Sequence, residues 1–295
     1  MKKLITSLFI LVLVFSLIGC SSSESSSSGK ESEGETTLEK VKREGKVTVG
    51  FANEIPYAYK TPDGELTGLG VEVARAVFKR MGINEMEGVL TEFGSMIPAV
   101  KAKRFDIITA GMYITPERAK EVDFANPEYS IGESIGVKVG NPFNIKSYED
   151  IKNNKDIKVA VLSGTVEQKY LLKVGVSEDQ IKLLPDLPSA FSALKSGRVD
   201  VVATTRPSLK DLLDKTKDSG IEIVEDFVQP VIDGKSVRSY GATVFRQEDD
   251  DFREAFNKEL EVLKESGELL EILEKFGLTE QELPGDVKAE ELLKD

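Results

Sequence analysis

Alternating apolar and polar positions mark the first strand of the folded chain. Residues 47, 49 and 51 are apolar, and Lys, Thr and Gly occupy 46, 48 and 50, which is the period-two pattern of a half-buried strand. From 69 to 80 the apolar positions follow a 3.6-residue period, which predicts a helix that packs on a sheet and ends at Gly82. Further patterns predict strands at 86–91, 131–139, 157–162, 199–203 and 221–224, with helices between them and after them. We expect an α/β fold whose sheets are built from parallel strands.

A short stretch of the sequence recurs later in the chain. Five residues of 95–106 return at a constant offset of 94 positions, and both copies continue into an apolar run rich in β-branched residues. The pairs are Ser95 and Ser189, Ala99 and Ala193, Lys101 and Lys195, Arg104 and Arg198, and Asp106 and Asp200. An ungapped match of this kind predicts two similar α/β lobes, each with a helix that opens at the serine. A cleft between two lobes is a usual site for a small ligand.

The expected order of the chain follows from these elements. Residues 38–130 plus 241–295 are predicted to form the first lobe, and residues 131–240 the second. The chain would cross between the lobes near 129–138 and again near 239–246. Two crossings of this kind predict a two-segment hinge.

The N-terminal segment predicts export and a lipid anchor. Two lysines precede an apolar run at 4–18, which has the length of a signal-peptide core and is short for a membrane span. The letters LIGC at 17–20 resemble a bacterial lipobox, so residues 1–19 are expected to be removed and Cys20 to carry lipid. Residues 20–37, rich in Ser and Glu, lack the apolar content to fold and predict a flexible tether. The protein would then work outside the cytoplasm, anchored to the cell membrane.

Composition excludes several kinds of function. The net charge is −12 and no basic block is present, which argues against a nucleic-acid surface. The chain has no histidine, and its single cysteine is Cys20, so internal disulfides and histidine- or cysteine-rich metal sites are excluded. Nucleophile-elbow, Walker A and dinucleotide fingerprints are absent. We expect no enzyme, metal or cofactor, although folding could still bring carboxylates together as a pair.

Two positions could hold an anion. Thr115 is placed to cap a helix that begins with Pro116, which would put Arg118 in the first turn of that helix. A cation there is disfavoured by the helix dipole unless an anion joins it; otherwise Arg118 would extend into water or pair with Glu121. Ser163, Gly164 and Thr165 follow a strand and would start a helix, where backbone N–H groups suit a carboxylate. An ordinary capped helix start is the alternative for this second position.

Three aromatic residues could hold a cation. Tyr57, Phe93 and Tyr113 each follow a predicted strand, and aromatic faces attract cations. Glu54 lies three residues before Tyr57 and could add a negative charge. Together with Arg118 these residues describe a site for a zwitterion, while core or rim packing is the alternative for the aromatics.

Four segments resemble a known family. They are GFANEIPYAYK, GVLTEFGSMIPAVKAKRFDIITAGMYITPERAKEV, PVIDGKSVRSYGA and GLTEQELPGDV. They resemble the extracytoplasmic solute-binding proteins of ABC importers, in the group that includes the polar amino-acid binders, and are most similar to its ectoine- and hydroxyectoine-binding members. The resemblance covers about residues 38–288. It implies a two-lobed fold that closes over its ligand and passes it to a membrane permease.

The resemblance also implies roles for the site residues. Glu54 would meet the charged ring nitrogens of ectoine, and the three aromatics would form a cage around them. Arg118 would bind the carboxylate, helped from the other lobe by Thr165, and Gly164 beside it is a further candidate. Thr204 and Thr205 are further candidates of the second lobe.

Other functions stay open at this point. The nearest is a binder of polar amino acids or of another betaine-like zwitterion. A cyclohexadienyl dehydratase-like enzyme on the same fold would need a general acid, for which Glu54 is the obvious candidate, and a sensor lobe is a third alternative. We expect a monomer whose partners are the small ligand, the permease subunits and, through the lipid, the membrane.

Overall fold

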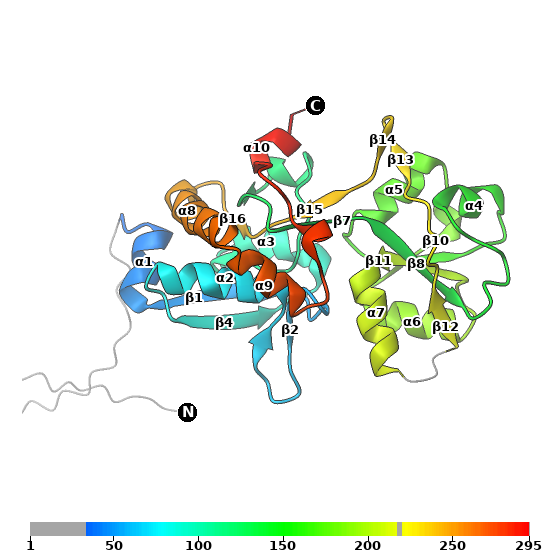
Figure 1. The fold of residues 1–295 in the computed structure, drawn as a ribbon, viewed down its shortest axis with the longest axis horizontal. Coiled ribbons are helices and arrows are strands. Elements are labelled where there is room, and N and C mark those ends of the chain that lie inside the picture. Colours follow the sequence, from blue (N-terminus) through cyan, green and yellow to red (C-terminus); the bar gives the residue numbers. More distant parts are fainter. Residues whose placement is uncertain (1–33, 217–219, 295) are drawn as a thin grey trace, which may run out of the picture. The chain divides into compact units, whose positions relative to one another are not determined.

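Two separate five-stranded sheets organise the folded chain (Figure 1). The computed structural model describes residues 34–216 and 220–294. The predicted signal segment, Cys20 and most of the predicted tether therefore lie outside the described residues. We call each sheet, with the helices that cover it, a lobe.

The first sheet has the strand order β4-β1-β5-β16-β6. Its strands are β4 (Glu85–Leu90), β1 (Lys46–Phe51), β5 (Ile107–Ile108), β16 (Val244–Phe245) and β6 (Asp123–Phe124). β1 is parallel to β4 and β5, and β16 is antiparallel to β5 and β6.

The second sheet repeats this pattern in the order β10-β9-β11-β8-β12. Its strands are β10 (Ile181–Leu184), β9 (Val159–Leu162), β11 (Val201–Thr205), β8 (Glu133–Lys138) and β12 (Ile221–Ile223). β9 is parallel to β10 and β11, whereas β8 is antiparallel to β11 and β12. The expectation of parallel sheets is therefore wrong for one strand in each sheet, β16 in the first and β8 in the second, which runs against both of its neighbours.

The repeated sequence stretch occupies equivalent places in the two sheets. The Asp106 carboxylate accepts a hydrogen bond from the backbone N–H of Thr48 at 2.8 Å. The Asp200 carboxylate does the same for the N–H of Lys158 at 2.9 Å. Each aspartate thus ties its strand to the neighbouring parallel strand, which explains why this residue recurs with the helix before it.

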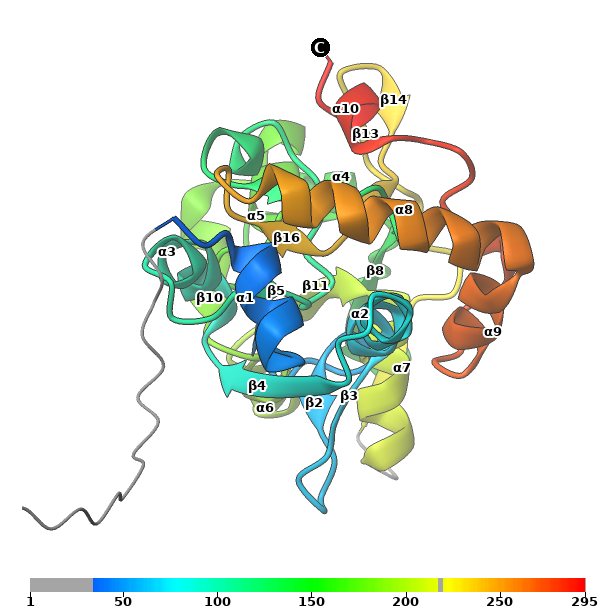
Figure 2. The ribbon, with the colours of Figure 1, turned by 90° about the vertical axis from the view of Figure 1, so that its left-hand side faces the viewer.

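Helices cover both sheets. Those of the first lobe are α1 (Thr37–Glu44), α2 (Leu69–Arg80), α3 (Met96–Lys101), α8 (Asp250–Ser266), α9 (Glu268–Glu274) and α10 (Ala289–Leu292). Those of the second lobe are α4 (Tyr148–Asn153), α5 (Glu167–Val174), α6 (Leu187–Lys195) and α7 (Arg206–Lys215). α2, α8 and α9 pack on one another, as Figure 2 shows. α1 begins with a capping box at Thr36 and ends at Gly45, whose backbone is left-handed.

Three predicted helix starts differ from the structure. Ser95 precedes α3, but its side chain makes no capping hydrogen bond. Asp186, not Ser189, caps α6 by accepting from the Ser189 N–H. The turn at 163–166 is not helical, so α5 begins only at Glu167. In the last two cases a nearby polar residue or a left-handed glycine competes with the predicted start.

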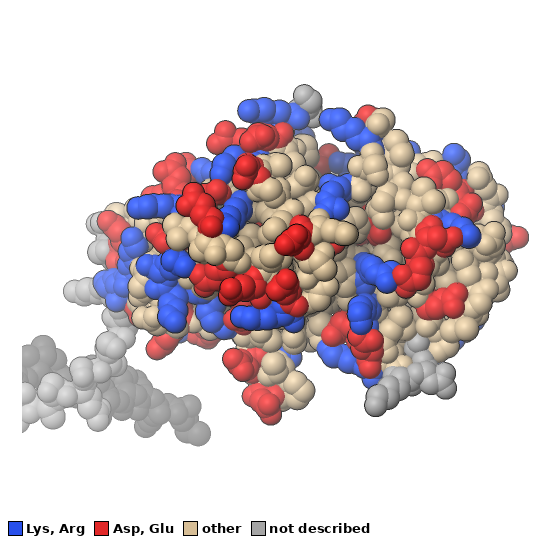
Figure 3. Space-filling view, in the orientation of Figure 1, with Lys and Arg blue, Asp and Glu red and all other residues tan. Residues whose placement is uncertain are grey.

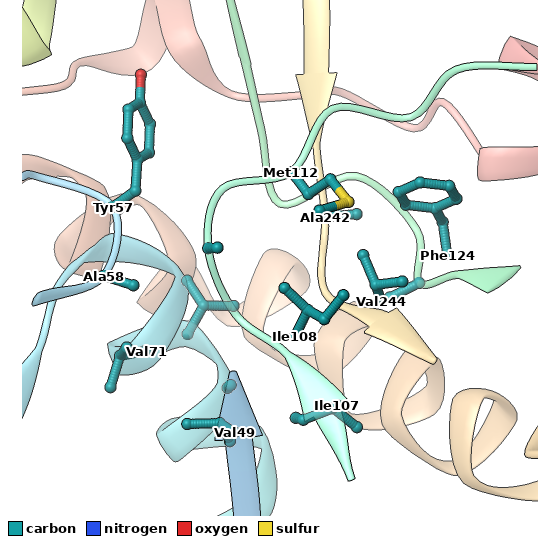
Figure 4. Packing of buried hydrophobic residues seen from close by; sticks show 14 of the residues in the cluster. Val49, Tyr57, Ala58, Val71, Ile107, Ile108, Met112, Phe124, Ala242 and Val244 are labelled. Atoms are coloured by element: carbon teal, nitrogen blue, oxygen red, sulfur yellow. The ribbon is translucent and has the colours of Figure 1, made fainter. Parts of the chain in front are cut away.

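Apolar packing fixes the position of each sheet. In the second lobe, Val159 and Val161 contribute to one buried cluster, and Ala160 and Leu162 to another. β9 is therefore buried on both faces, as expected for a central strand between helices. In the first lobe one large cluster fills the space around β1, β5 and α2, part of which is drawn in Figure 4.

A two-stranded ribbon connects the lobes. β7 (Tyr129–Ile131) pairs antiparallel with β15 (Ser239–Gly241), and both lie between the two sheets in Figure 1. Short hairpins are formed by β2 (Tyr59–Lys60) with β3 (Leu66–Thr67) and by β13 (Val231–Ile232) with β14 (Lys235–Ser236). The lobe boundaries at 130/131 and 240/241 stay a prediction, which this ribbon supports.

The surface carries charges of both signs. On the face in Figure 3, basic and acidic side chains are intermixed, and no broad basic area stands out. Within the described residues, no helix combines the length and the apolar character needed to cross a membrane.

Candidate ligand-binding site

A small cavity collects residues from both lobes. It encloses about 330 Å³ of space between protein atoms, part of it open to solvent. The lining residues are Glu54, Tyr57, Phe93, Ala110, Gly111, Tyr113, Arg118, Thr165, Val166, Glu167, Thr204 and Thr205. Most of them lie at or just beyond the carboxyl ends of β1, β4, β5, β9 and β11. This edge is where open α/β sheets usually bind ligands.

Sequence reasoning found most of this lining. Of the eight predicted ligand-binding residues, all but Gly164 line the cavity. Gly164 directly precedes the lining residue Thr165, and its backbone carbonyl accepts a hydrogen bond from Arg118. Ala110, Gly111, Val166 and Glu167 were missed. Glu167 lies in the first turn of α5, and nothing in its local sequence distinguishes it from the many exposed glutamates of the chain.

Arg118 connects the two lobes at the cavity. Its Nη1 donates to the Tyr113 carbonyl at 2.8 Å, and its Nη2 donates to the Gly164 carbonyl at 2.9 Å. The guanidinium also lies over the Phe93 ring, 5.5 Å from the ring centroid. These contacts hold a positive charge at the cavity wall with its planar fork in a fixed orientation.

The local structure around Arg118 differs from the prediction. The Thr115 hydroxyl accepts from the Arg118 N–H at 3.2 Å, as a cap would. However, only a single 3₁₀ turn, Arg118–Lys120, follows. A turn this short has no substantial dipole, so a helix dipole gives no reason for an anion to bind at Arg118. Glu121 pairs with Lys101 and not with Arg118.

Two of the three aromatic residues predicted to form a cage pack against another tyrosine, Tyr129. Tyr57 stacks on Tyr129 with ring centroids 5.5 Å apart, and Tyr113 lies 6.4 Å from the same ring. Tyr129 is fully buried and supports both cavity-lining rings from behind. Phe93 has one face engaged by Arg118, so its predicted contact with a ligand cation stays a prediction.

Gly111 allows these rings to pack closely. A Cβ at this position would come within 2.7 Å of the Tyr57 ring and 2.9 Å of the Tyr129 hydroxyl, and the backbone φ is +66°. The Tyr129 hydroxyl donates to the Gly111 carbonyl at 2.8 Å. Only glycine satisfies both the close approach and the left-handed backbone.

A chain of hydrogen bonds through hydroxyl groups joins the lobes at the cavity wall. The Tyr57 and Thr205 hydroxyls are 2.8 Å apart, and Thr205 donates to the Ser208 hydroxyl at 3.2 Å. Ser208 in turn donates to the Glu54 carboxylate at 3.3 Å. In Figure 4 the Tyr57 hydroxyl points away from the aliphatic core. Tyr57 and Glu54 come from the first lobe and the two other residues from the second, so the chain forms only when the lobes meet.

Buried carboxylates make the site electrostatically unusual. Burial, with the charge of Glu167 nearby, raises the pKa of Glu54 from 4.5 to about 7. Burial also raises the pKa of Glu167, which hydrogen bonds from the Thr165 side chain and from the backbone, together with the positive charge of Arg118, partly oppose. Burial makes the ionised form of each carboxylate costly, and a positive charge beside it lowers that cost. Glu54 and Glu167 therefore suit the positive end of a ligand.

We expect the protein without ligand to be more stable at pH 5 than at pH 8. Between the two pKa values, 4.5 in the unfolded chain and about 7 in the folded state, the folded protein holds a proton on Glu54 that the unfolded chain has released. Stability therefore falls as pH rises through this window, by roughly 3 kcal/mol for a pKa that moves from 4.5 to about 7. Thermal unfolding at both pH values measures the difference.

Glu54→Gln is the matched control for this pH dependence. The variant removes the titrating group while keeping its shape, so its stability should change less between pH 5 and pH 8. An identical pH dependence in the variant would mean that Glu54 does not titrate in this range.

Among the residues that the structure describes, no group of three or more potential metal ligands comes together.

Known protein families and sequences include relatives of this chain. The family model for bacterial extracellular solute-binding proteins, family 3, matches residues 47–279. A probable amino-acid ABC transporter periplasmic-binding protein of Sinorhizobium fredii is 38% identical over 246 residues, covering 83% of this chain and 81% of the relative. The L-cystine-binding protein TcyJ of Escherichia coli is 29% identical over 243 residues, covering 82% and 86%.

Solved structures of binding proteins are also similar to this chain. The crystal structure of EhuB in complex with hydroxyectoine matches with a TM-score of 0.79 and 34% identity, covering 88% of this chain and 98% of that one. An ancestral arginine-binding protein bound to arginine matches with a TM-score of 0.68 and 33% identity, covering 79% and 98%.

Proposed function

This chain belongs to the bacterial extracellular solute-binding proteins of family 3, and on that premise we propose that it binds ectoine or hydroxyectoine for an ABC importer. Ectoine carries a delocalised amidinium close to a carboxylate. Arg118 would bind the carboxylate through its planar fork. Tyr57, Tyr113 and Glu54 would hold the amidinium by ring faces and a negative charge.

One observation carries this proposal. A guanidinium and a set of aromatic and carboxylate side chains line the same small cavity, and both lobes contribute to it. A small dipolar molecule whose charges lie close together can satisfy both sides at once. The similarity to a protein crystallised with hydroxyectoine supports the same ligand class.

A polar amino acid is the second candidate ligand. Relatives of this chain are named for amino acids, cystine and arginine among them, and a guanidinium side chain would also suit the carboxylates of the cavity. Calorimetric titration with ectoine, hydroxyectoine, glycine betaine, proline and arginine separates the candidates. Micromolar or tighter binding of arginine, with no heat from ectoine, would overturn the proposal.

We propose that the protein binds its ligand without transforming it. An ancestral amino acid-binding protein described as a precursor of cyclohexadienyl dehydratase has the same fold, with a TM-score of 0.70 and 30% identity. Incubation with prephenate or arogenate tests the enzymatic alternative. Formation of a product that Glu54→Gln no longer makes would establish it.

The proposal includes a partner and an anchor. Ligand would stabilise the closed form, because only that form brings both lobes onto it, and the closed monomer would dock on the permease. Lipid at Cys20 would keep the protein at the membrane. Incorporation of labelled palmitate by the wild type but not by Cys20→Ser tests this anchor.

Tyr113→Ala is expected to weaken ectoine binding more than Tyr113→Phe does. The alanine variant loses a ring face worth about 2 kcal/mol to a desolvated cation, or roughly 30-fold in Kd. The phenylalanine variant keeps that face and loses only the buried hydroxyl, which has no partner among the described residues. Titration calorimetry compares the two, and equal losses would show that the hydroxyl bonds the ligand.

A further inference from the structure

Glu167 is a cavity-lining carboxylate that the proposed function leaves without a role. It lies in the first turn of α5 in the second lobe, and only 4% of it is exposed. Its Oε2 atom is buried and has no hydrogen-bond partner among the residues that the structure describes, 34–216 and 220–294. A buried acceptor without a partner costs free energy in the unliganded protein. A ligand that donates a hydrogen bond to this atom would remove that cost.

The charges of the cavity are unequal. Two carboxylates, Glu54 and Glu167, line it against a single guanidinium, Arg118. If Arg118 binds the ligand carboxylate, both glutamates face the positive end of the ligand. A cation with a single N–H donor would leave one of them unpaired, whereas an amidinium or guanidinium has at least two donors on different nitrogens.

We propose that Glu167 is a specificity-determining residue that accepts a hydrogen bond from a second N–H of a delocalised ligand cation, while Glu54 accepts from the first. The inference rests on the proposed function for the identity of the ligand, although its chemistry extends to guanidinium compounds. Binding brings the two carboxylates, one from each lobe, onto one cation. The site therefore selects delocalised N–H cations over quaternary ammonium ions, which have no N–H and would leave the buried Oε2 unpaired.

Glu167→Gln tests the assignment, because the variant should lose affinity for ectoine and gain stability without ligand. Loss of the charge-assisted hydrogen bond should raise the Kd for ectoine by roughly 10- to 150-fold. Removal of a buried carboxylate whose Oε2 has no hydrogen-bond partner should at the same time raise the unfolding temperature of the unliganded protein. A residue that only supports the fold would lower both stability and affinity when changed.

Glu133→Gln is the matched control. Glu133, at the start of β8, is also a buried glutamate with an unpartnered oxygen, but it does not line the cavity. Its variant should keep the Kd for ectoine within about threefold and likewise gain stability. Equal loss of affinity in both variants would overturn the assignment, because the effect would then come from charge near the cavity and not from contact with the ligand.

The titrations also separate this inference from the proposed function. If wild type binds ectoine and Glu167→Gln binds it equally well, the role of Glu167 is wrong and the proposed ligand stands. If wild type does not bind ectoine but binds arginine, the proposed ligand is wrong. Titration of Glu167→Gln and Glu133→Gln with arginine then decides the role of Glu167. Binding of glycine betaine as tightly as ectoine would overturn the selectivity.

Discussion

Replacing Arg118 with alanine is expected to remove most of the affinity for ligand. Truncating one partner of a buried, hydrogen-bonded charge pair costs about 2–5 kcal/mol, or roughly 30- to 5,000-fold in Kd. The structure adds a second reason, because Arg118 also donates across the lobes to the Gly164 carbonyl. Its removal should therefore weaken closure as well as contact with the ligand. Titration calorimetry with ectoine measures the loss.

Two further variants give this result its meaning. Arg118→Lys keeps the charge but not the planar fork that reaches two acceptors, so it should fall between wild type and alanine. Lys120→Ala removes an exposed cation from the same 3₁₀ turn and should leave the Kd unchanged. Affinity within threefold of wild type in Arg118→Ala would remove Arg118 from the site.

Gly164→Ala is expected to prevent full closure of the lobes. A Cβ at Gly164 would lie 2.6 Å from the Cα of Gly94 and 3.2 Å from its nitrogen. Gly94 belongs to the first lobe, so two backbones from different lobes meet here and neither can yield as a flexible side chain could. Overpacking of this kind costs typically 1–3 kcal/mol. Because only the closed form bears that cost, the Kd should rise roughly 5- to 150-fold.

Gly140→Ala provides a matched control for backbone strain. Gly140 has a φ of +80°, close to the +84° of Gly164, but no atom lies within 4 Å of its added Cβ. Both variants should lose some stability, and only Gly164→Ala should lose affinity. Small-angle X-ray scattering adds a direct test, because Gly164→Ala should stay extended when ligand is added. Normal compaction with full affinity would show that this contact does not limit closure.

These predictions rest on contacts of different predictability. Tyr57, Phe93 and Tyr113 could be identified because each follows a strand, and strand ends are visible in the alternation of apolar residues. Arg118 could be identified from its position beside Thr115 and Pro116, although the reason given there, a helix dipole, was wrong. Arg118 nevertheless lines the cavity, because it follows the carboxyl edge of the first sheet and its side chain reaches the second lobe at Gly164.

Other features had no local signal. The strands β16 and β6 are two residues each, too short to show a period, and a period does not encode that β16 runs against both of its neighbours. The carboxylate of Glu167 resembles every other glutamate until the fold buries it. The Asp186 cap of α6 was overlooked because Ser189 three residues later gives a similar signal.

The sequence by itself determined the main strands and helices, the duplication of an α/β unit and most of the residue types that line the cavity. These depend on short-range periodicity and on residue types at strand ends, which the chain carries locally. Only the tertiary structure decided which groups share the cavity. Arg118 and Gly164 are 46 residues apart, and Glu54 and Ser208 are 154 residues apart. Contacts over such separations form because two buried sheets fix where their strand edges meet, and no local pattern contains that information.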